Sequence, residues 1–125
     1  MLELDQGWQL EMERGPDWLF VRLDAASHAA HPPADLAESI WRLLRQHFTN
    51  RLVLEMDDLP ILCSELIGQM VILHKRIYMD GGLMRVCGLS EGHRLALRSC
   101  RISDRFPSYR NREDAVMGHR PALPR

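Results

Sequence analysis

The sequence predicts a single α/β domain in which a β-hairpin is followed by alternating helices and strands (αβαβα). Polar and apolar residues alternate over Gln9–Glu13 and Leu19–Leu23, which is typical of the two strands of a hairpin. Short apolar runs at Leu52–Met56 and Leu83–Cys87 flank an amphipathic segment with helical spacing. Strands separated by helices require right-handed crossovers, so we expect a mixed, mainly parallel central sheet that helices cover.

The first part of the chain should contain the hairpin and one helix. Arg14–Asp17 holds a Gly-Pro pair, which is a turn signal between the two hairpin strands. Residues 25–33 are rich in Ala, His and Pro and show no periodicity, so we expect a loop there. A helix should then begin at Asp35, because apolar residues recur from there at helical spacing, namely Leu36, Ile40, Leu43, Leu44 and Phe48.

The middle of the chain should contain the centre of the sheet. Leu52–Met56 is almost continuously apolar, which favours a central strand covered on both faces. Ser64–Met79 has the period of a helix of about four turns. Asp80-Gly81-Gly82 should end that helix as a glycine C-cap. The residues expected to face inward from the helix are Leu66, Met70, Leu73 and Ile77, with Ile67, Val71 and Tyr78 beside them on the buried arc.

Three short elements are expected in the last third of the chain. Ser90 should cap a helix that turns Leu95, Leu97 and Ile102 inward. Phe106–Tyr109 predicts a short final strand, and Arg112–Met117 predicts a brief helix. We therefore expect one domain over residues 1–118 and a flexible tail over residues 119–125, which include two prolines and two arginines.

The composition is that of an ordinary soluble protein. Of the 125 residues, 46% are apolar and 26% are charged, and the formal net charge is -1, so no basic field favours nucleic acid or an anionic membrane. No membrane-span or signal-peptide pattern is present, so we expect a cytoplasmic protein whose partner is a protein or a small molecule. Cys63, Cys87 and Cys100 cannot all pair and are expected to be reduced, buried thiols.

Short motifs follow one another in a defined order between Arg51 and Val116. The motifs are the strand Leu52–Met56, the helix entrance Cys63-Ser64-Glu65-Leu66-Ile67-Gly68, His74-Lys75-Arg76, the turn Gly81-Gly82, Val86-Cys87-Gly88-Leu89-Ser90, and Ile102–Pro107. Their order resembles that of the STAS domain, the fold of bacterial anti-sigma factor antagonists, over about half of the chain.

The resemblance implies a non-enzymatic signalling domain, without a cofactor, that binds an anti-sigma factor or a scaffold protein. In the family, a kinase that is also the anti-sigma factor phosphorylates a serine at the helix entrance. Alignment on Gly68 places Glu65 at that position, whereas a shift of one residue makes Ser64 the phosphoacceptor, and both alignments stay open. The plain alternative is that Ser64 only caps the helix.

A partner-binding surface is therefore expected around this helix entrance. A phosphate on Ser64 would bring about -1.5 to -2 charges next to acidic residues, and a partner that accepts the unmodified form would be repelled. Ile72 and Met79 are apolar residues on the expected solvent face of the helix, where they would form the centre of a docking surface. The full set comprises Asp57, Asp58, Cys63, Ser64, Glu65, Gly68, Gln69, Ile72 and Met79.

Two other functions fit the sequence. The domain could be a constitutive STAS-like scaffold subunit without phosphorylation. Separately, Glu65 at the phosphoacceptor position could hold the protein in a phosphorylated-like state. The domain could also be a thiol sensor or small enzyme that uses Cys63, because a helix N-terminus favours a thiolate. His28 and His31 lack a third ligand nearby, and no nucleotide-binding or nucleophile-elbow motif is present, so neither a metal nor a cofactor is expected. The oligomeric state is left open.

Overall fold

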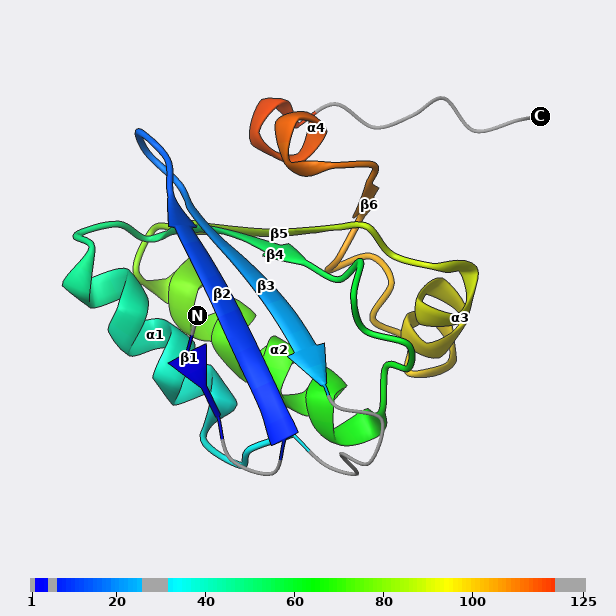
Figure 1. The fold of residues 1–125 in the computed structure, drawn as a ribbon. Helices are drawn as coiled ribbons and strands as arrows, with labels where there is room; N and C mark the ends of the chain where they lie inside the picture. Colours follow the sequence, from blue (N-terminus) through cyan, green and yellow to red (C-terminus); the bar gives the residue numbers. More distant parts are fainter. Residues whose placement is uncertain (1, 5–6, 26–31, 119–125) are drawn as a thin grey trace.

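The described part of the chain forms one mixed sheet. The computed structural model describes residues 2–4, 7–25 and 32–118 (Figure 1). Each strand is hydrogen-bonded to the next one along the chain, with antiparallel pairs from β1 to β3 and parallel pairs from β3 to β6. The strands are β1 (Leu2–Glu3), β2 (Trp8–Arg14), β3 (Leu19–Ala25), β4 (Arg51–Glu55), β5 (Leu83–Cys87) and β6 (Ser108–Tyr109).

This sheet confirms the predicted hairpin followed by a mainly parallel region. The hairpin is β2 and β3, with Leu10 opposite Leu23 and Met12 opposite Val21. The strand β1 was not predicted, because a strand of two residues carries no periodicity. It pairs with Gln9 and Leu10 of β2 at the edge of the sheet.

The helices cover the two faces of the sheet unequally. Because the strands follow one another in one direction, right-handed crossovers place α1 and α2 on the same face, where they pack side by side (Figure 1). The short helix α4 lies on the other face, and α3 lies beyond the end of β5. The helices are α1 (Leu36–Gln46), α2 (Ser64–Met79), α3 (Glu91–Ser99) and α4 (Arg112–Met117).

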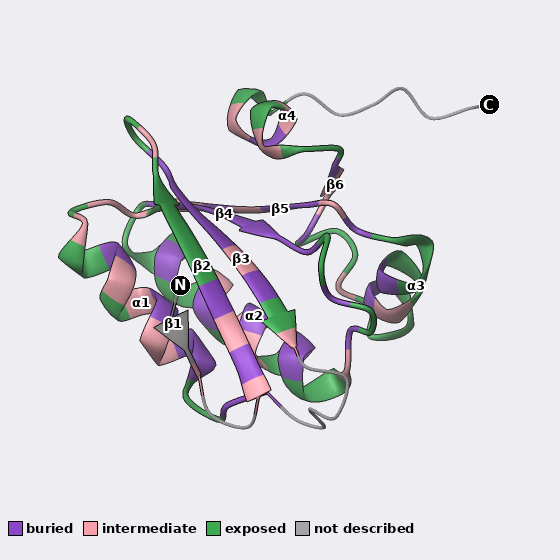
Figure 2. Ribbon diagram, in the orientation of Figure 1, coloured by how far each residue is buried: buried purple, intermediate pink, exposed green. Residues whose placement is uncertain are grey.

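Two apolar clusters follow from this arrangement. The main core lies between the sheet and helices α1 and α2, and Figure 2 shows the buried stripes of both helices turned toward the sheet. A smaller cluster lies under α4, where Trp18, Phe20 and Val53 pack with Ala115. The strand β4 is buried at four of its five positions, and this burial on both faces explains its nearly continuous apolar sequence.

Three of the residues predicted to face inward point to solvent instead. Tyr78, at the edge of the α2 arc, is 69% exposed. Phe48 lies beyond the end of α1 and is 95% exposed, because the chain reverses direction there and takes the residue off the apolar stripe. Leu95 of α3 is 50% exposed, whereas Leu97 is buried as expected. The other buried residue of α3 is His93, which is 2% exposed and was not predicted to face inward.

The predicted ends of the helices are largely confirmed. Ser90 caps α3 in a capping box in which its hydroxyl accepts a hydrogen bond from the His93 N–H and His93 Nδ1 accepts one from the Ser90 N–H, both at 3.1 Å. Gly81 follows α2 with a φ of 78°, as a glycine C-cap requires. Asp35 precedes α1 but forms no side-chain capping bond.

The three cysteines differ in exposure. All are free thiols, but only Cys87 is buried; Cys63 is half-buried and Cys100 is exposed, which corrects the expectation of three buried thiols. Among the described helices, none has the length and apolar character needed to cross a membrane. His28, His31 and residues 119–125 lie outside the described residues.

Gly82 and Gly68 give a matched test of this packing. At Gly82 an added Cβ would overlap the backbone oxygen of Asn50, whereas at Gly68 it would meet no atom within 4 Å. We expect Gly82→Ala to lower the free energy of unfolding by more than about 2 kcal/mol, and Gly68→Ala to raise it by roughly 0.5–1 kcal/mol through helix propensity. Urea denaturation of both variants measures this, and equal effects would contradict the described packing.

Candidate functional site at the entrance of helix α2

The connection from β4 to α2 is held in place by apolar side chains while its polar side chains face solvent. Leu59 and Leu62 are buried in the main core, and the Leu59 N–H donates to the Met56 oxygen at 3.1 Å. Asp57 and Asp58 between them are exposed. The loop is therefore anchored at several points and presents two carboxylates on its surface.

The glycine that directly follows β5 lies against one of these carboxylates. Gly88 has a φ of 71°, and a Cβ built on it would overlap the Asp57 carboxylate. Only glycine combines this backbone conformation with such a close approach. The end of β5 and the loop after β4 are thus packed against each other at the site.

Helix α2 spans Ser64–Met79 as predicted, but its N-cap lies one residue before Ser64. Cys63 is the N-cap, with extended backbone angles and no side-chain capping bond, and its oxygen accepts the first helical hydrogen bond from the Ile67 N–H at 3.0 Å. Ser64 is the first residue of the helix, so the expectation that Ser64 caps it is wrong. Its side chain is exposed, and its Oγ lies 3.5 Å from Glu65 Oε2. The hydroxyl is accessible to a modifying enzyme.

Most of the predicted site residues meet at this end of the helix. Ser64, Glu65 and Gly68 are exposed, and Cys63 is half-buried against the main core. Gln69 is different, because its Oε1 accepts a hydrogen bond from the Ala37 N–H at 2.9 Å and so ties α2 to the first turn of α1. The Gln69 side-chain amide therefore stabilises the contact between α1 and α2.

The two apolar residues of α2 predicted to form a docking surface, Ile72 and Met79, do not form one surface with this entrance. Ile72 is 54% exposed and Met79 is 90% exposed, so both face solvent as predicted. Met79, however, is the last residue of α2, and about 1.5 Å of rise per residue places it roughly 22 Å from Ser64 along the helix axis. Only Ile72 can contribute to a contact that includes Ser64.

A buried carboxylate beneath the site was not predicted from the sequence. Glu55, at the end of β4, is 5% exposed, and each of its oxygens accepts a hydrogen bond from an arginine. Arg22 of β3 donates to Oε2 at 3.1 Å, and Arg112 of α4 donates to Oε1 at 2.7 Å. Arg22 also lies 3.6 Å from Asp58, which links the buried carboxylate to the exposed loop.

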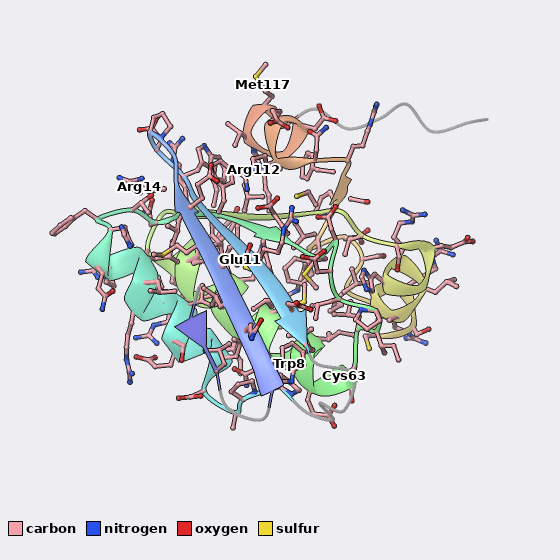
Figure 3. All side chains as sticks on the ribbon, in the orientation of Figure 1. Trp8, Glu11, Arg14, Cys63, Arg112 and Met117 are labelled. Carbon is pink, nitrogen blue, oxygen red and sulfur yellow. The ribbon has the colours of Figure 1, made fainter. Side chains whose placement is uncertain are left out.

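The same network reaches the surface on the α4 side of the sheet. Arg112 donates a second hydrogen bond to Glu13 at 2.7 Å, and its guanidinium lies 4.4 Å from the centre of the Phe20 ring. Figure 3 shows Arg112 and Glu11 on the open face of the sheet, where a polar hollow of about 260 Å³ lies over the network. The hydrogen bonds to Glu55 raise the pKa of both Arg22 and Arg112.

One feature of the sequence indicates this network, namely a single carboxylate within an apolar strand. A buried carboxylate needs a cationic partner. The partners lie 33 and 57 residues away along the chain, and the sequence offers 16 lysines and arginines to choose from. Periodicity does not identify which of them meet Glu55.

Three side chains near the site bring possible metal-ligand atoms close together. Glu55, Asp57 and Cys87 place one ligand atom each within 4.8 Å of one another. Both oxygens of Glu55 are already occupied by arginines, and burial, followed by the charges of Glu55 and Asp57, raises the pKa of Cys87 to about 12. Because a cation would have to displace arginines and ionise this thiol, the cluster does not favour a metal.

Comparison with known proteins identifies the fold. No protein-family model and no curated protein matches the chain. An anti-sigma factor antagonist from Mycobacterium paratuberculosis has the same fold, with 17% identity, a TM-score of 0.72, and alignment over 96% of this chain and 100% of that one. The unphosphorylated anti-sigma factor antagonist SpoIIAA has 15% identity and a TM-score of 0.67, and the alignment covers 88% of this chain and 97% of that one. A chain of the stressosome, described as a signal integration and transduction hub, has 11% identity and a TM-score of 0.71, and the alignment covers 87% of this chain and 95% of that one.

These similarities confirm the STAS fold that the sequence motifs predicted. They extend over most of the chain, including the first fifty residues, which had matched the fold only by the order of their strands and helix. At these identities they establish the architecture of the domain.

The buried carboxylate yields the first test of the site. Glu55→Gln removes the buried anion that both arginines bind, while Asp58 stays beside Arg22 and Glu13 beside Arg112. Because the buried contact is lost on both sides, we expect the free energy of unfolding to fall by about 2–4 kcal/mol. Glu13→Gln is the matched control, because Glu13 binds the same Arg112 at the same 2.7 Å but is exposed. In this variant the free energy of unfolding should fall by less than about 1 kcal/mol. Similar losses in both variants would mean that Glu55 is not the structural centre of the network.

The cysteines yield a test of local burial and of pH dependence. Alkylation at neutral pH should modify exposed Cys100 first and Cys87 only on unfolding. The raised pKa of Cys87, about 12, keeps this thiol protonated in the folded state while the unfolded thiol ionises from about pH 8.5. The unfolded state then binds fewer protons, so the free energy of unfolding should fall as pH rises through this interval, and fall less steeply in Cys87→Ala. Identical pH profiles would contradict this assignment.

Proposed function

Because the chain has the fold of anti-sigma factor antagonists, we propose that it is a non-enzymatic regulatory domain that binds a partner protein through the entrance of α2. The proposed partner is an anti-sigma factor that is also a serine kinase, and the proposed phosphoacceptor is Ser64. The observation that carries this proposal is the exposed Ser64 hydroxyl on the first residue of α2, beside the exposed carboxylates of Asp57 and Asp58.

Phosphorylation at Ser64 would act through charge. The N-terminal end of a helix is favourable for a phosphate, because backbone N–H groups and the helix dipole both face it. The phosphate would add about -1.5 to -2 charges to a surface that already holds Asp57, Asp58 and Glu65. A partner that binds this acidic loop in its unmodified form would be repelled, while the fold beneath the loop would stay in place.

The surface proposed for the partner is smaller than the one expected from the sequence. It consists of the exposed loop residues Asp57 and Asp58, the first turn of α2, and the partly exposed side chain of Ile72 as an apolar contact. Gln69 is excluded from it by its bond to α1, and Met79 by its distance along the helix.

A constitutive scaffold subunit is the second candidate. It is favoured by the 3.5 Å approach of the Glu65 carboxylate to the Ser64 hydroxyl, which places a permanent negative charge where a phosphate would otherwise be added. It is also favoured by the similarity of the fold to a stressosome chain. The proposed thiol function is less favoured, because Cys63 packs against the main core and is half-buried.

Incubation with the cognate kinase and ATP, followed by intact-mass measurement, tests the proposal. We expect one added phosphate in the wild type and in Ser99→Ala, and none in Ser64→Ala; Ser99 is an exposed serine in the last turn of α3. Partner binding, measured by calorimetry, should be retained in Ser64→Ala and weakened at least about ten-fold by Ser64→Glu.

The same measurements separate the two candidates. A stable complex without phosphate transfer, weakened by Glu65→Gln, supports the scaffold subunit. Transfer to another residue, or binding that is unaffected by Ser64→Glu and Glu65→Gln alike, would exclude the entrance of α2 as the contact surface.

A further inference from the structure

A second hollow lies at the opposite end of the sheet from Ser64. It is an open groove of about 610 Å³ between the β2–β3 turn, the loop from α1 to β4, and the end of α2. Figure 3 shows Arg14, which lines it, at the far end of the molecule from Cys63. Its charged lining residues are three arginines, Arg14, Arg45 and Arg51, and two aspartates, Asp17 and Asp80, so arginines exceed carboxylates by one. Phe48 also lines it.

Phe48 occupies a backbone position that normally belongs to glycine. The Phe48 N–H donates to the Arg45 oxygen at 3.2 Å and the Thr49 N–H donates to the Leu44 oxygen at 3.1 Å, which is the Schellman pattern at the end of α1. The residue at this position must be left-handed, and Phe48 has a φ of 53°. A residue with a side chain is strained in this conformation.

No packing contact with the core compensates for the strain at Phe48. The Phe48 side chain is 95% exposed, so its ring contributes nothing to the core. Arg101 has the same left-handed conformation after α3, with a φ of 59°, but its charged side chain is well solvated there. Because strained backbone conformations cluster at functional sites, Phe48 is a candidate contact residue for another molecule.

The walls of the groove are fixed in advance by hydrogen bonds. Thr49 Oγ1 donates to the Asp17 oxygen at 2.8 Å and accepts from the Arg51 N–H at 3.2 Å, so the hairpin turn, the loop and β4 are joined. Asn50 Nδ2 donates to the Asp80 oxygen at 3.0 Å and joins the end of α2. A ligand would meet a preformed surface and would not have to order it.

The charge of the groove is incompletely balanced. Among the described residues, only one of its three arginines lies within ion-pair distance of a carboxylate, Arg45 at 4.0 Å from Asp80. Arg14 donates to the Gly15 oxygen, and the Arg51 guanidinium lies 5.9 Å from the centre of the Trp18 ring. A molecule that binds this groove should therefore present carboxylates to Arg14 and Arg51.

We propose that this groove is a second protein-docking site, which binds an acidic peptide segment of a partner with an apolar or aromatic side chain against Phe48. A small molecule fits less well, because small-molecule sites are concave and mostly apolar, whereas this groove is open and polar. Arginine and aromatic side chains supply most of the binding energy at protein interfaces. The site lies about one length of α2 from Ser64 and does not depend on the function proposed there.

Selection from a library of random displayed peptides tests this site without knowledge of the partner. The library is selected on the wild-type chain and depleted on Phe48→Gly. We expect the enriched peptides to contain acidic residues around an aromatic or aliphatic one. Fluorescence anisotropy of a selected peptide should show roughly ten-fold weaker binding to Phe48→Gly and to Arg51→Gln. Arg98→Gln, an exposed arginine of α3 outside the groove, and Ser64→Ala should bind as the wild type does.

Thermal unfolding separates lost contact from lost folding. Phe48→Gly removes the left-handed strain, so it should melt roughly 2–5 °C above the wild type while binding more weakly. A lower melting temperature, enriched peptides without acidic residues, or the absence of any peptide that depends on Phe48 overturns the proposal. Phe48-dependent self-association of the chain in sedimentation measurements also overturns it, because the occupant would then be a second copy.

Discussion

The buried carboxylate of Glu55 is the interaction on which the second face of the sheet depends. The central strand β4 is covered on both sides, and a lone charge within it is stable only when oppositely charged groups reach it. One arginine comes from the neighbouring strand and the other from α4, so a single carboxylate joins the sheet to the last helix. Arg112 also covers the Phe20 ring, and the ionic and apolar contacts of α4 are therefore made by the same side chain.

The elements that the sequence predicted correctly are those encoded by local patterns. The alternation in β2 and β3, the apolar runs of β4 and β5, the helical period of α2 and the Ser90 cap all depend on residues near one another in the chain. The features that were not predicted depend on contacts between distant residues. The Glu55 network and the interior place of His93 are set by the tertiary structure, and β1 is too short to show a pattern.

The candidate site shows the same division. The exposure of Ser64 and Glu65 at the start of α2 follows from helix periodicity, which is a local property. The identity of the N-cap was off by one residue, because Cys63 adopts the extended backbone of a cap without a capping side chain. Periodicity placed Ile72 and Met79 on one face correctly, but it did not convey that the length of the helix separates Met79 from the entrance. Phe48 was assigned to the core because its spacing continues the α1 stripe past the end of the helix.

The short strand β1 leaves part of the sheet edge without a neighbour among the described residues. It pairs with Gln9 and Leu10 only, so the outer side of β2 from Glu11 to Arg14 presents unpaired backbone groups. Such an edge is a template for the addition of strands from other molecules, and ionised side chains oppose that addition. Glu11 and Glu13 place two carboxylates along this edge, flanking Met12. Glu13 is paired with Arg112, so the carboxylate of Glu11 is the charge that should oppose the addition of a further strand along this edge.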